Sequence, residues 1–549
     1  MVEKLYGSVD RVSKEFIELY GSKNKVSKRI IKVYGSVSNR AEIVFNKGSE
    51  NFGEIEYYVD DTYTTTAKVK LTSQEEVDKL GQDMEIYSWS IVIDGVTITN
   101  NMVKSVILTS KVTSLPTWFL ICCKELVHID ISEANITSIP SGFLYMCDKF
   151  DEQFVIPSSI TSIGDDFLGD CISFKQPITI PSGVVTIGEG FMRWCKSFNL
   201  PITIPSGVTT IESGFLSYCT VFNSTITLPS NITSIGDDFL RSCSAFNQPL
   251  SIPSGVISIG EGFLMLCDSF NQPVILPPLL EKIDDWFMAW CSNFNQPLTI
   301  PSSVTTIGVE FMAQLSNFNQ PIIIPDTVTS IGERSIYGMG KFNNTIQLSN
   351  NLSELPNVFI DGLSVFNQPI TFPPNITSIG DGVLSSNPAF NQPIVVPSGV
   401  TSIGDRFLCD NYSFNSQLTL SQSLKTIGTN FMNRCYEFNQ PLTLPNTLTS
   451  IGDYFMQQDT NFNKTLTLPD SLVSIGTSFM YDDWVMTSQI NVGNLHASIA
   501  EESDNTFACY QSSRPMYYTG VPIHGTYAQE WVDRFPTHNT RPYRKTMVA

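Results

Sequence analysis

The chain has 549 residues, of which 42% are hydrophobic and 16% are charged, and its formal net charge is −20 at pH 7. This composition is typical of a folded protein and not of a disordered one, and the sequence contains no run of eighteen apolar residues that would span a membrane. The strong negative charge disfavours nucleic acid and anionic lipid as partners.

The charge is unevenly distributed. Residues 1–50 hold ten Lys/Arg and six Asp/Glu, a net +4, residues 491–549 hold five of each, and −24 therefore falls on residues 51–490. A solvated acidic surface is the favoured interpretation, and a basic partner is the alternative. The first residues lack the apolar segment of a secretory signal, so we expect a protein that acts outside a cell to leave it by another route.

Residues 1–50 contain a short repeat. LYGS, LYGS and VYGS recur at equal intervals, each followed by a stretch with strand-like alternation. The pattern predicts strands joined by Gly-Ser turns, with Tyr6, Tyr20 and Tyr34 at equivalent turns. Because tyrosine is favoured at interfaces, we predict that these residues attach the chain to a scaffold, and an arm without a partner is the alternative.

Residues 51–110 are predicted to form a small α+β module. The segments GEIEYYV and TTTAKVKL alternate as paired strands do, and Thr72 or Ser73 can cap a short helix that begins near Glu75. Such a module would cover the open N-terminal edge of the array that follows.

Residues 111–490 repeat with a fixed period of 24 residues, which is the separation of Leu115 and Ile139 in the sequence. The anchor residue of the motif SIG recurs from Leu115 to Ile475 in fifteen such steps without insertion or deletion. This period predicts a solenoid of stacked, β-rich units. Each repeat is predicted to form two short strands separated by Pro, followed by a helical turn that begins at Asp or Glu. Parallel strands of successive repeats would stack about 4.8 Å apart and give a curved rod roughly 70–80 Å long. Residues 491–549 are predicted to be a C-terminal cap, or a tail that docks a partner.

The repeated segment IPSxVTSIGDxFLxxC resembles the BspA-type (Treponema-type) leucine-rich repeat, whose usual unit is IPxxVxxIxxxAFxxC. The FNQPLT insert resembles the FNQ-type repeats of bacterial surface lipoproteins. The resemblance covers residues 110–490, and the chain departs from it by Phe-Leu or Phe-Met in place of Ala-Phe. It implies an extracellular, virion or cell-surface binding protein without catalysis.

Two columns of the repeat are candidates for structure or for ligand contact. A Phe recurs in register from Phe150 to Phe462 and is predicted to form a buried aromatic spine, with an exposed ligand strip as the alternative. The Asn that follows it is predicted to hydrogen-bond along the stack and to close its own turn. The representative residues are Phe174, Phe198, Phe222, Phe246, Phe270, Phe294, Phe318, Asn247, Asn271 and Asn295.

Two further columns carry ionisable side chains. An Asp or Glu after the SIG motif, as at Asp165 and Asp237, is predicted to cap the helical turn, and calcium bridging between units is the alternative. A Cys recurs from Cys123 to Cys291 and is predicted to fill a buried apolar slot as a reduced thiol, although Asn occupies the slot in two later units. We assign neither a metal nor a cofactor to the chain.

No motif of a nucleophilic, metal-dependent or nucleotide-binding enzyme occurs, and the four histidines are scattered. The sequence therefore predicts a non-catalytic binding or adhesion protein, displayed on a phage virion through its N-terminal region. A bacterial cell-surface adhesin is the alternative, and a carbohydrate-active enzyme is less favoured. The expected partners are a protein or glycan on a cell surface and a virion or surface scaffold. We expect no binding of nucleic acid and no membrane insertion, and self-association is left open.

Overall fold

The computed structural model describes residues 51–60, 62–81, 88–480, 488–500 and 523–534, and the backbone of three strands within residues 1–50. These strands form an antiparallel sheet in the order β1-β3-β2: β1 (Tyr6–Ser8), β2 (Ile30–Gly35) and β3 (Arg40–Phe45). Tyr6 and Tyr34 each pair in register with Glu42. Both tyrosines therefore lie within strands and not at turns, whereas Tyr20 lies outside the described residues.

The N-terminal module consists of a four-stranded sheet, a hairpin and short helices. The sheet has the order β5-β4-β8-β9, and β9 also belongs to the first turns of the rod, so both parts share one hydrophobic core. The Ser73 hydroxyl accepts the backbone N–H of Glu76 at 3.3 Å and caps the helix, as predicted. The elements are β4 (Gly53–Tyr58), β5 (Thr66–Leu71), α1 (Gln74–Asp78), β6 (Ser90–Ile93), β7 (Val96–Thr99), η2 (Asn100–Met102), β8 (Val103–Leu108) and β9 (His128–Asp130).

The predicted solenoid is confirmed: the SIG motifs form two-residue strands that pair in parallel with their equivalents in adjacent repeats, as Ile163 pairs with Ile139 and Ile187. The pairing is interrupted after Ile187, Ile259 and Ile331. The isoleucine points inward and the preceding Ser or Thr points outward. This first set of strands is β10 (Ser138–Ile139), β11 (Ser162–Ile163), β12 (Thr186–Ile187), β14 (Thr210–Ile211), β16 (Ser234–Ile235), β17 (Ser258–Ile259), β18 (Lys282–Ile283), β19 (Thr306–Ile307), β21 (Ser330–Ile331), β23 (Glu354–Leu355), β24 (Ser378–Ile379), β26 (Ser402–Ile403), β28 (Thr426–Ile427), β29 (Ser450–Ile451) and β31 (Ser474–Ile475).

A second set of strands follows the FNQP segments, and the last of them continue into the C-terminal cap. There the Trp531 indole N–H donates to the carbonyl of Leu495 at 2.9 Å and closes the core. The set and the remaining elements are β13 (Ile202–Thr203), β15 (Ile226–Thr227), β20 (Ile322–Ile323), β22 (Ile346–Gln347), β25 (Ile394–Val395), β27 (Leu418–Thr419), β30 (Leu466–Thr467), β32 (Ile490–Gly493), η3 (Ala497–Ile499), β33 (Ile523–Gly525) and α2 (Ala528–Arg534).

In the repeats that the structure describes, the expected helical turn is absent, and that prediction is wrong. In its place alternate residues adopt a left-handed backbone, with φ of 54° at Asp166, 54° at Leu168 and 56° at Asp170. Each repeat forms one turn of the solenoid, here called a rung. The N–H of Asp166 donates to the carbonyl of Glu189 on the next rung at 2.7 Å, and the N–H of Leu168 donates to the carbonyl of Phe143 on the previous rung at 2.9 Å. A helix would bond within itself, whereas this zigzag joins neighbouring rungs.

The left-handed positions explain one column of the repeat. Its residues are often Gly, Asp or Asn, which adopt positive φ most readily, but Val358 also stands there with φ 54°. A β-branched side chain is strained in this region. We therefore expect Val358→Gly to raise the stability of the rod by about 1 kcal/mol, less the entropy of the added glycine.

The matched control is the reverse change on the next rung, Gly382→Val, where φ is 64°. It should lower the melting temperature in thermal unfolding, while Val358→Gly raises it. If both variants melted below the unchanged protein, left-handed strain at this position would not be the cause.

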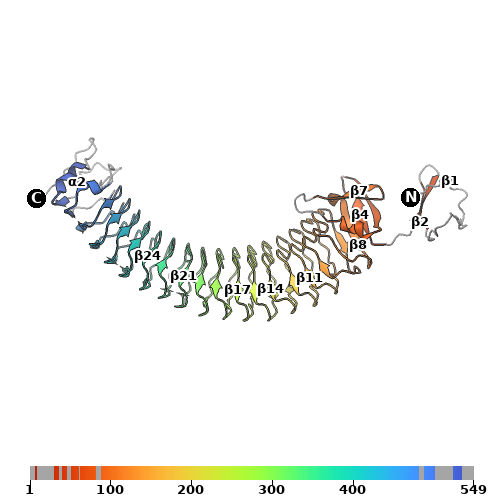
Figure 1. Ribbon diagram of the computed structural model, residues 1–549, viewed down its shortest axis with the longest axis horizontal. Helices are drawn as coiled ribbons and strands as arrows, with labels where there is room; N and C mark the ends of the chain where they lie inside the picture. The colour runs from red at the N-terminus through yellow and green to blue at the C-terminus, as the bar shows by residue number, and fades with distance from the viewer. Residues whose placement is uncertain are drawn as a thin grey trace.

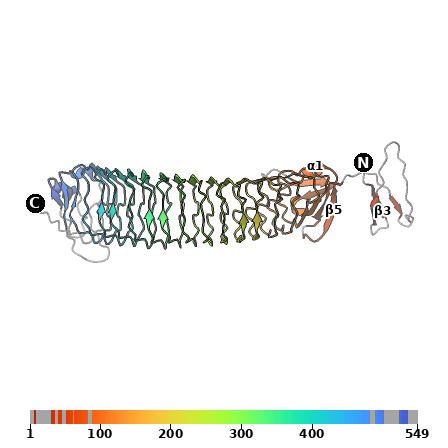
Figure 2. The ribbon, with the colours of Figure 1, turned by 90° about the horizontal axis from the view of Figure 1, so that it is seen from below.

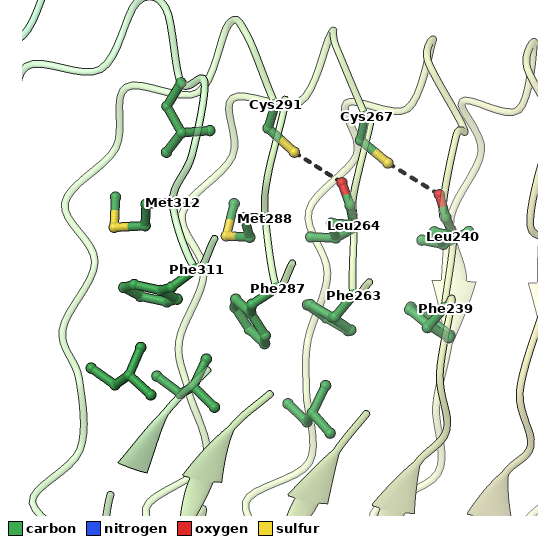
Figure 3. Close-up of a cluster of buried hydrophobic side chains, with 14 of the residues drawn as sticks. Phe239, Leu240, Phe263, Leu264, Cys267, Phe287, Met288, Cys291, Phe311 and Met312 are labelled. Atoms are coloured by element: carbon green, nitrogen blue, oxygen red, sulfur yellow. Dashed lines mark hydrogen bonds between the residues drawn. The ribbon is translucent and has the colours of Figure 1, made fainter. Parts of the chain in front are cut away.

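The rungs stack into the curved rod of Figure 1, and Figure 2 shows the rungs side by side along it. The Phe spine has ring centroids 5.7–6.2 Å apart, whereas a second Phe ladder, from Phe119 to Phe479, has spacings of 4.8–6.1 Å and is interrupted at Ser335 and Val383. Figure 3 shows part of this second ladder, with Phe239, Phe263, Phe287 and Phe311 in a row. The Phe rings of the spine, which belong to the FNQ segments, are thus spaced more widely than those of the second ladder. In a curved rod the wider spacing belongs to the convex side, so the FNQ segments lie there.

Candidate binding surfaces

The Phe residues of the spine lie in the core. Phe174, Phe198, Phe222, Phe246, Phe270 and Phe294 are fully buried, and Phe318 is 1% exposed. Their rings stack on one another at interplanar angles of 2° to 15°. These side chains therefore hold the rungs together and present no surface to a ligand.

The Asn column forms a ladder that faces outward. In each rung the side-chain Oδ1 accepts the backbone N–H of the Asn one rung later at 2.7–3.0 Å, as Asn247 does from Asn271 and Asn271 from Asn295. The bonds run from backbone to amide and not from amide to amide. A following Gln, such as Gln296, donates its Nε2 to the same Asn oxygen at 3.1–3.2 Å.

The acidic column makes the same kind of contact and caps no helix. Asp165 Oδ1 accepts the N–H of Glu189 at 3.0 Å, and Asp237 that of Glu261 at 2.9 Å, in each case one rung later. The carboxylate lies over the glycine of the next rung, where a Cβ on Gly188 would stand 2.3 Å from Asp165 Oδ1. This close contact explains why the residue before the acid, the last of the SIG motif, is a glycine. Among the described residues, no three His, Cys, Asp or Glu side chains are placed to hold a metal ion.

The Cys column is buried, but its slot is not simply apolar. Each Cys of the column from Cys147 to Cys291, and Cys435, donates its S–H to the carbonyl 27 residues earlier, at 2.9–3.2 Å (Figure 3). Asn387 and Asn411 donate their Nδ2 to the equivalent carbonyls at 2.7 Å. The slot thus accepts a hydrogen-bond donor as well as an apolar side chain such as the buried Leu315, which explains the asparagines. Burial raises the pKa of the Cys219 thiol to about 12, so the thiols stay protonated at neutral pH.

Asp459 occupies the same column as these donors and is fully buried. Its Oδ1 accepts the N–H of Cys435 at 2.8 Å, as Asn411 Oδ1 accepts that of Asn387. Burial raises the pKa of the Asp459 carboxyl well above its ordinary value, so the folded chain favours the neutral acid.

The resulting pH dependence can be measured. Because the folded pKa is raised, Asp459 contributes its full stability below the unfolded pKa and loses it as pH rises toward the folded pKa. We expect Asp459→Asn, which keeps the shape without the charge, to melt higher than the unchanged protein at pH 8, with a smaller difference at pH 4. A difference that does not vary with pH would refute a neutral Asp459.

Two of the described histidines each lie beside a glutamate. His128 Nδ1 lies 2.9 Å from a Glu152 oxygen, and His496 Nδ1 lies 3.0 Å from Glu530. Neither pair is joined by a Ser, Thr or Cys side chain among the contacts of the described residues. The longest helix there, α2, has seven residues, so none of those helices could cross a bilayer.

Comparison with known proteins supports the repeat assignment. The chain matches the model of the BspA type leucine-rich repeat region over residues 92–199, 170–295, 281–415 and 386–513. No curated protein matches it. Among solved structures it is similar to a leucine-rich cell surface protein from Faecalibacterium prausnitzii, at 20% identity over 72% of this chain and 96% of that one, with a TM-score of 0.41.

A leucine-rich repeat protein from Bacteroides ovatus is 17% identical over 90% of this chain and 98% of that one, with a TM-score of 0.39. The pneumococcal vaccine antigen PcpA is 16% identical over 63% and 90%, with a TM-score of 0.35. The overlapping matches to the repeat model extend through most of the sequence, from residue 92 to residue 513. The chain therefore belongs to the BspA type leucine-rich repeat family.

Proposed function

We propose that this chain is a non-catalytic adhesion protein, displayed on a phage virion through its N-terminal region while the solenoid binds a protein or glycan on a cell surface. Display on a bacterial cell is the alternative context. The observation that carries the proposal is the unbroken outward ladder of Asn side chains, each oriented by a hydrogen bond to the next rung. A long, rigid surface that repeats one chemistry suits binding better than catalysis.

The two ends of the chain suggest a division of labour. Residues 1–50 carry +4, whereas −24 falls on residues 51–490, so the two parts suit different neighbours. The N-terminal strands pair only with one another among the described residues. We propose that this segment, with Tyr6, Tyr20 and Tyr34, attaches the chain to its scaffold.

Removal of residues 1–50 tests this polarity. The shortened protein should no longer be displayed on the virion or cell surface, as judged by immunogold labelling, but in purified form it should still bind target cells. A triple Tyr→Phe variant at residues 6, 20 and 34 is the milder companion. If the shortened protein lost cell binding and kept its place on the scaffold, the proposed polarity would be reversed.

A further inference from the structure

A polar groove lies on the outside of the rod, directly over the Phe spine. It has a volume of about 750 Å³ and is lined by Asn247, Ser269, Asn271, Asn293, Asn295, Asn317, Asn319 and Lys341. Its walls arise from a simple alternation: Phe294 turns inward and is fully buried, so Asn293 and Asn295 on either side of it turn outward. The same alternation on successive rungs produces two parallel amide walls.

The first wall presents fixed donors. Asn271 Oδ1 accepts the Asn295 N–H at 2.9 Å and the Gln296 Nε2 at 3.2 Å, which sets the orientation of the amide. Within the described part of the chain, the Nδ2 groups of Asn247, Asn271, Asn295 and Asn319 make no hydrogen bond. Each rung therefore offers one pre-oriented N–H₂ group to a bound molecule.

The second wall limits the groove to the middle of the rod. Asn317 Nδ2 donates to Asn293 Oδ1 at 2.9 Å, which leaves further amide donors and acceptors on this side. The equivalent positions on the flanking rungs are apolar, with Ala245 before the groove and Val365 after it. The double amide wall is thus a local feature and not a property of every repeat.

The chemistry of the lining selects among ligand classes. Lys341 is the one charged residue in the lining, and the chain as a whole is strongly acidic, so a polyanion is disfavoured. A peptide would add as a strand through free main-chain groups. Here the N–H of Asn293 donates to the Asp268 carbonyl at 3.1 Å and that of Asn295 donates to Asn271 Oδ1 at 2.9 Å, so these main-chain donors are already used. Side-chain amides, which donate and accept together, suit neutral hydroxyl groups.

We infer that this groove binds an extended, neutral glycan chain along the rod axis, about one sugar unit to a rung. This inference rests on the adhesion function proposed above and specifies the class of ligand that the solenoid binds. Four successive rungs contribute Asn247, Asn271, Asn295 and Asn319, so affinity should increase with glycan length and level off at about the length of the groove.

The test uses the full chain and labelled linear hexasaccharides of β-1,4-linked glucose, N-acetylglucosamine and mannose, with a hexagalacturonate and an unstructured neutral peptide for comparison. At least one neutral hexasaccharide should bind, measured by fluorescence anisotropy and calorimetry. Asn293→Ala with Asn317→Ala should weaken that binding roughly tenfold, as expected for the loss of two hydrogen bonds. Ser269→Trp, which fills the groove, should abolish it.

The matched control removes two exposed hydroxyls on successive rungs of another face, Thr305→Ala with Thr329→Ala. Each of these hydroxyls donates only to the carbonyl one rung earlier, at 3.3 Å and 3.4 Å, so affinity should not change. Equal weakening in both pairs, preference for the galacturonate or the peptide, or no binding of any neutral hexasaccharide would overturn the inference. The Asn293→Ala, Asn317→Ala protein could lose glycan binding and still bind cells. That result would refute the groove as the adhesion site but would leave the proposed adhesion function intact.

Discussion

Removal of one whole repeat, residues 260–283, should leave a folded and shorter rod. After this deletion Ile259 precedes Asp284, as Ile283 does now, and Asn295 takes the place after Asn247 that Asn271 holds now. Every inter-rung contact therefore finds an equivalent partner, including the bond from the Asn295 N–H to an Asn oxygen. Because each repeat contacts only its neighbours, the cost should be limited to the loss of one rung.

A deletion of half a repeat, residues 260–271, should unfold the rod beyond the cut. It would shift each later column by half a repeat, so that a Phe of the spine would meet a position that faces water. Circular dichroism during thermal melting and small-angle scattering would report stability and length. Similar melting of the two deletion proteins would argue against register as the basis of the fold.

Phe294→Ala should have the largest effect of any single substitution considered. The ring is fully buried and its centroid lies 6.1 Å from that of Phe270 and 6.0 Å from that of Phe318. Truncation of a buried Phe costs about 3–5 kcal/mol, since it removes apolar contact and leaves a cavity. In a solenoid the loss should appear as local opening of adjacent rungs, visible by hydrogen exchange.

An exposed residue of a neighbouring rung provides the control. Ile275 is 80% exposed, so Ile275→Ala should change stability by less than about 0.5 kcal/mol. Chemical denaturation of both variants gives the comparison. A loss below roughly 1 kcal/mol for Phe294→Ala would place its column at the surface, because that is the range of exposed side chains.

The repeat made most of the fold predictable, because the periodicity of its columns is a direct record of contact between units. Ile163 has an equivalent at the same place in the repeats before and after it because those residues pair in parallel. The helical turn was not predictable in this way. An acid followed by Phe and Leu resembles the first turn of a helix. The zigzag backbone is favoured instead because its N–H groups bond to the adjacent rungs, which the sequence of one repeat does not reveal.

The polar ladders show where sequence reasoning stopped. The amide of Asn271 could have bonded to another amide or to the backbone, and both choices have the same sequence pattern. In the Cys column, by contrast, Asn387 and Asn411 already argued against a purely apolar slot, although the carbonyl that they contact needed the structure. The groove between Asn293 and Asn295 needed the structure, because it depends on which residues beside each Phe turn outward.

The hydrogen bonds between rungs also determine how the chain would respond to force. Many of them, like that from Asn295 to Asn271, join equivalent places in successive repeats, and others join positions one residue to either side, so these bonds run along the rod. A pull on the two ends would load the rungs one after another, in series. Each rung that opened would free one repeat, about 80 Å of extended chain, and leave the next one intact. A molecule anchored at one end and held at the other would then lengthen in steps, absorbing mechanical shock before the attachment itself broke.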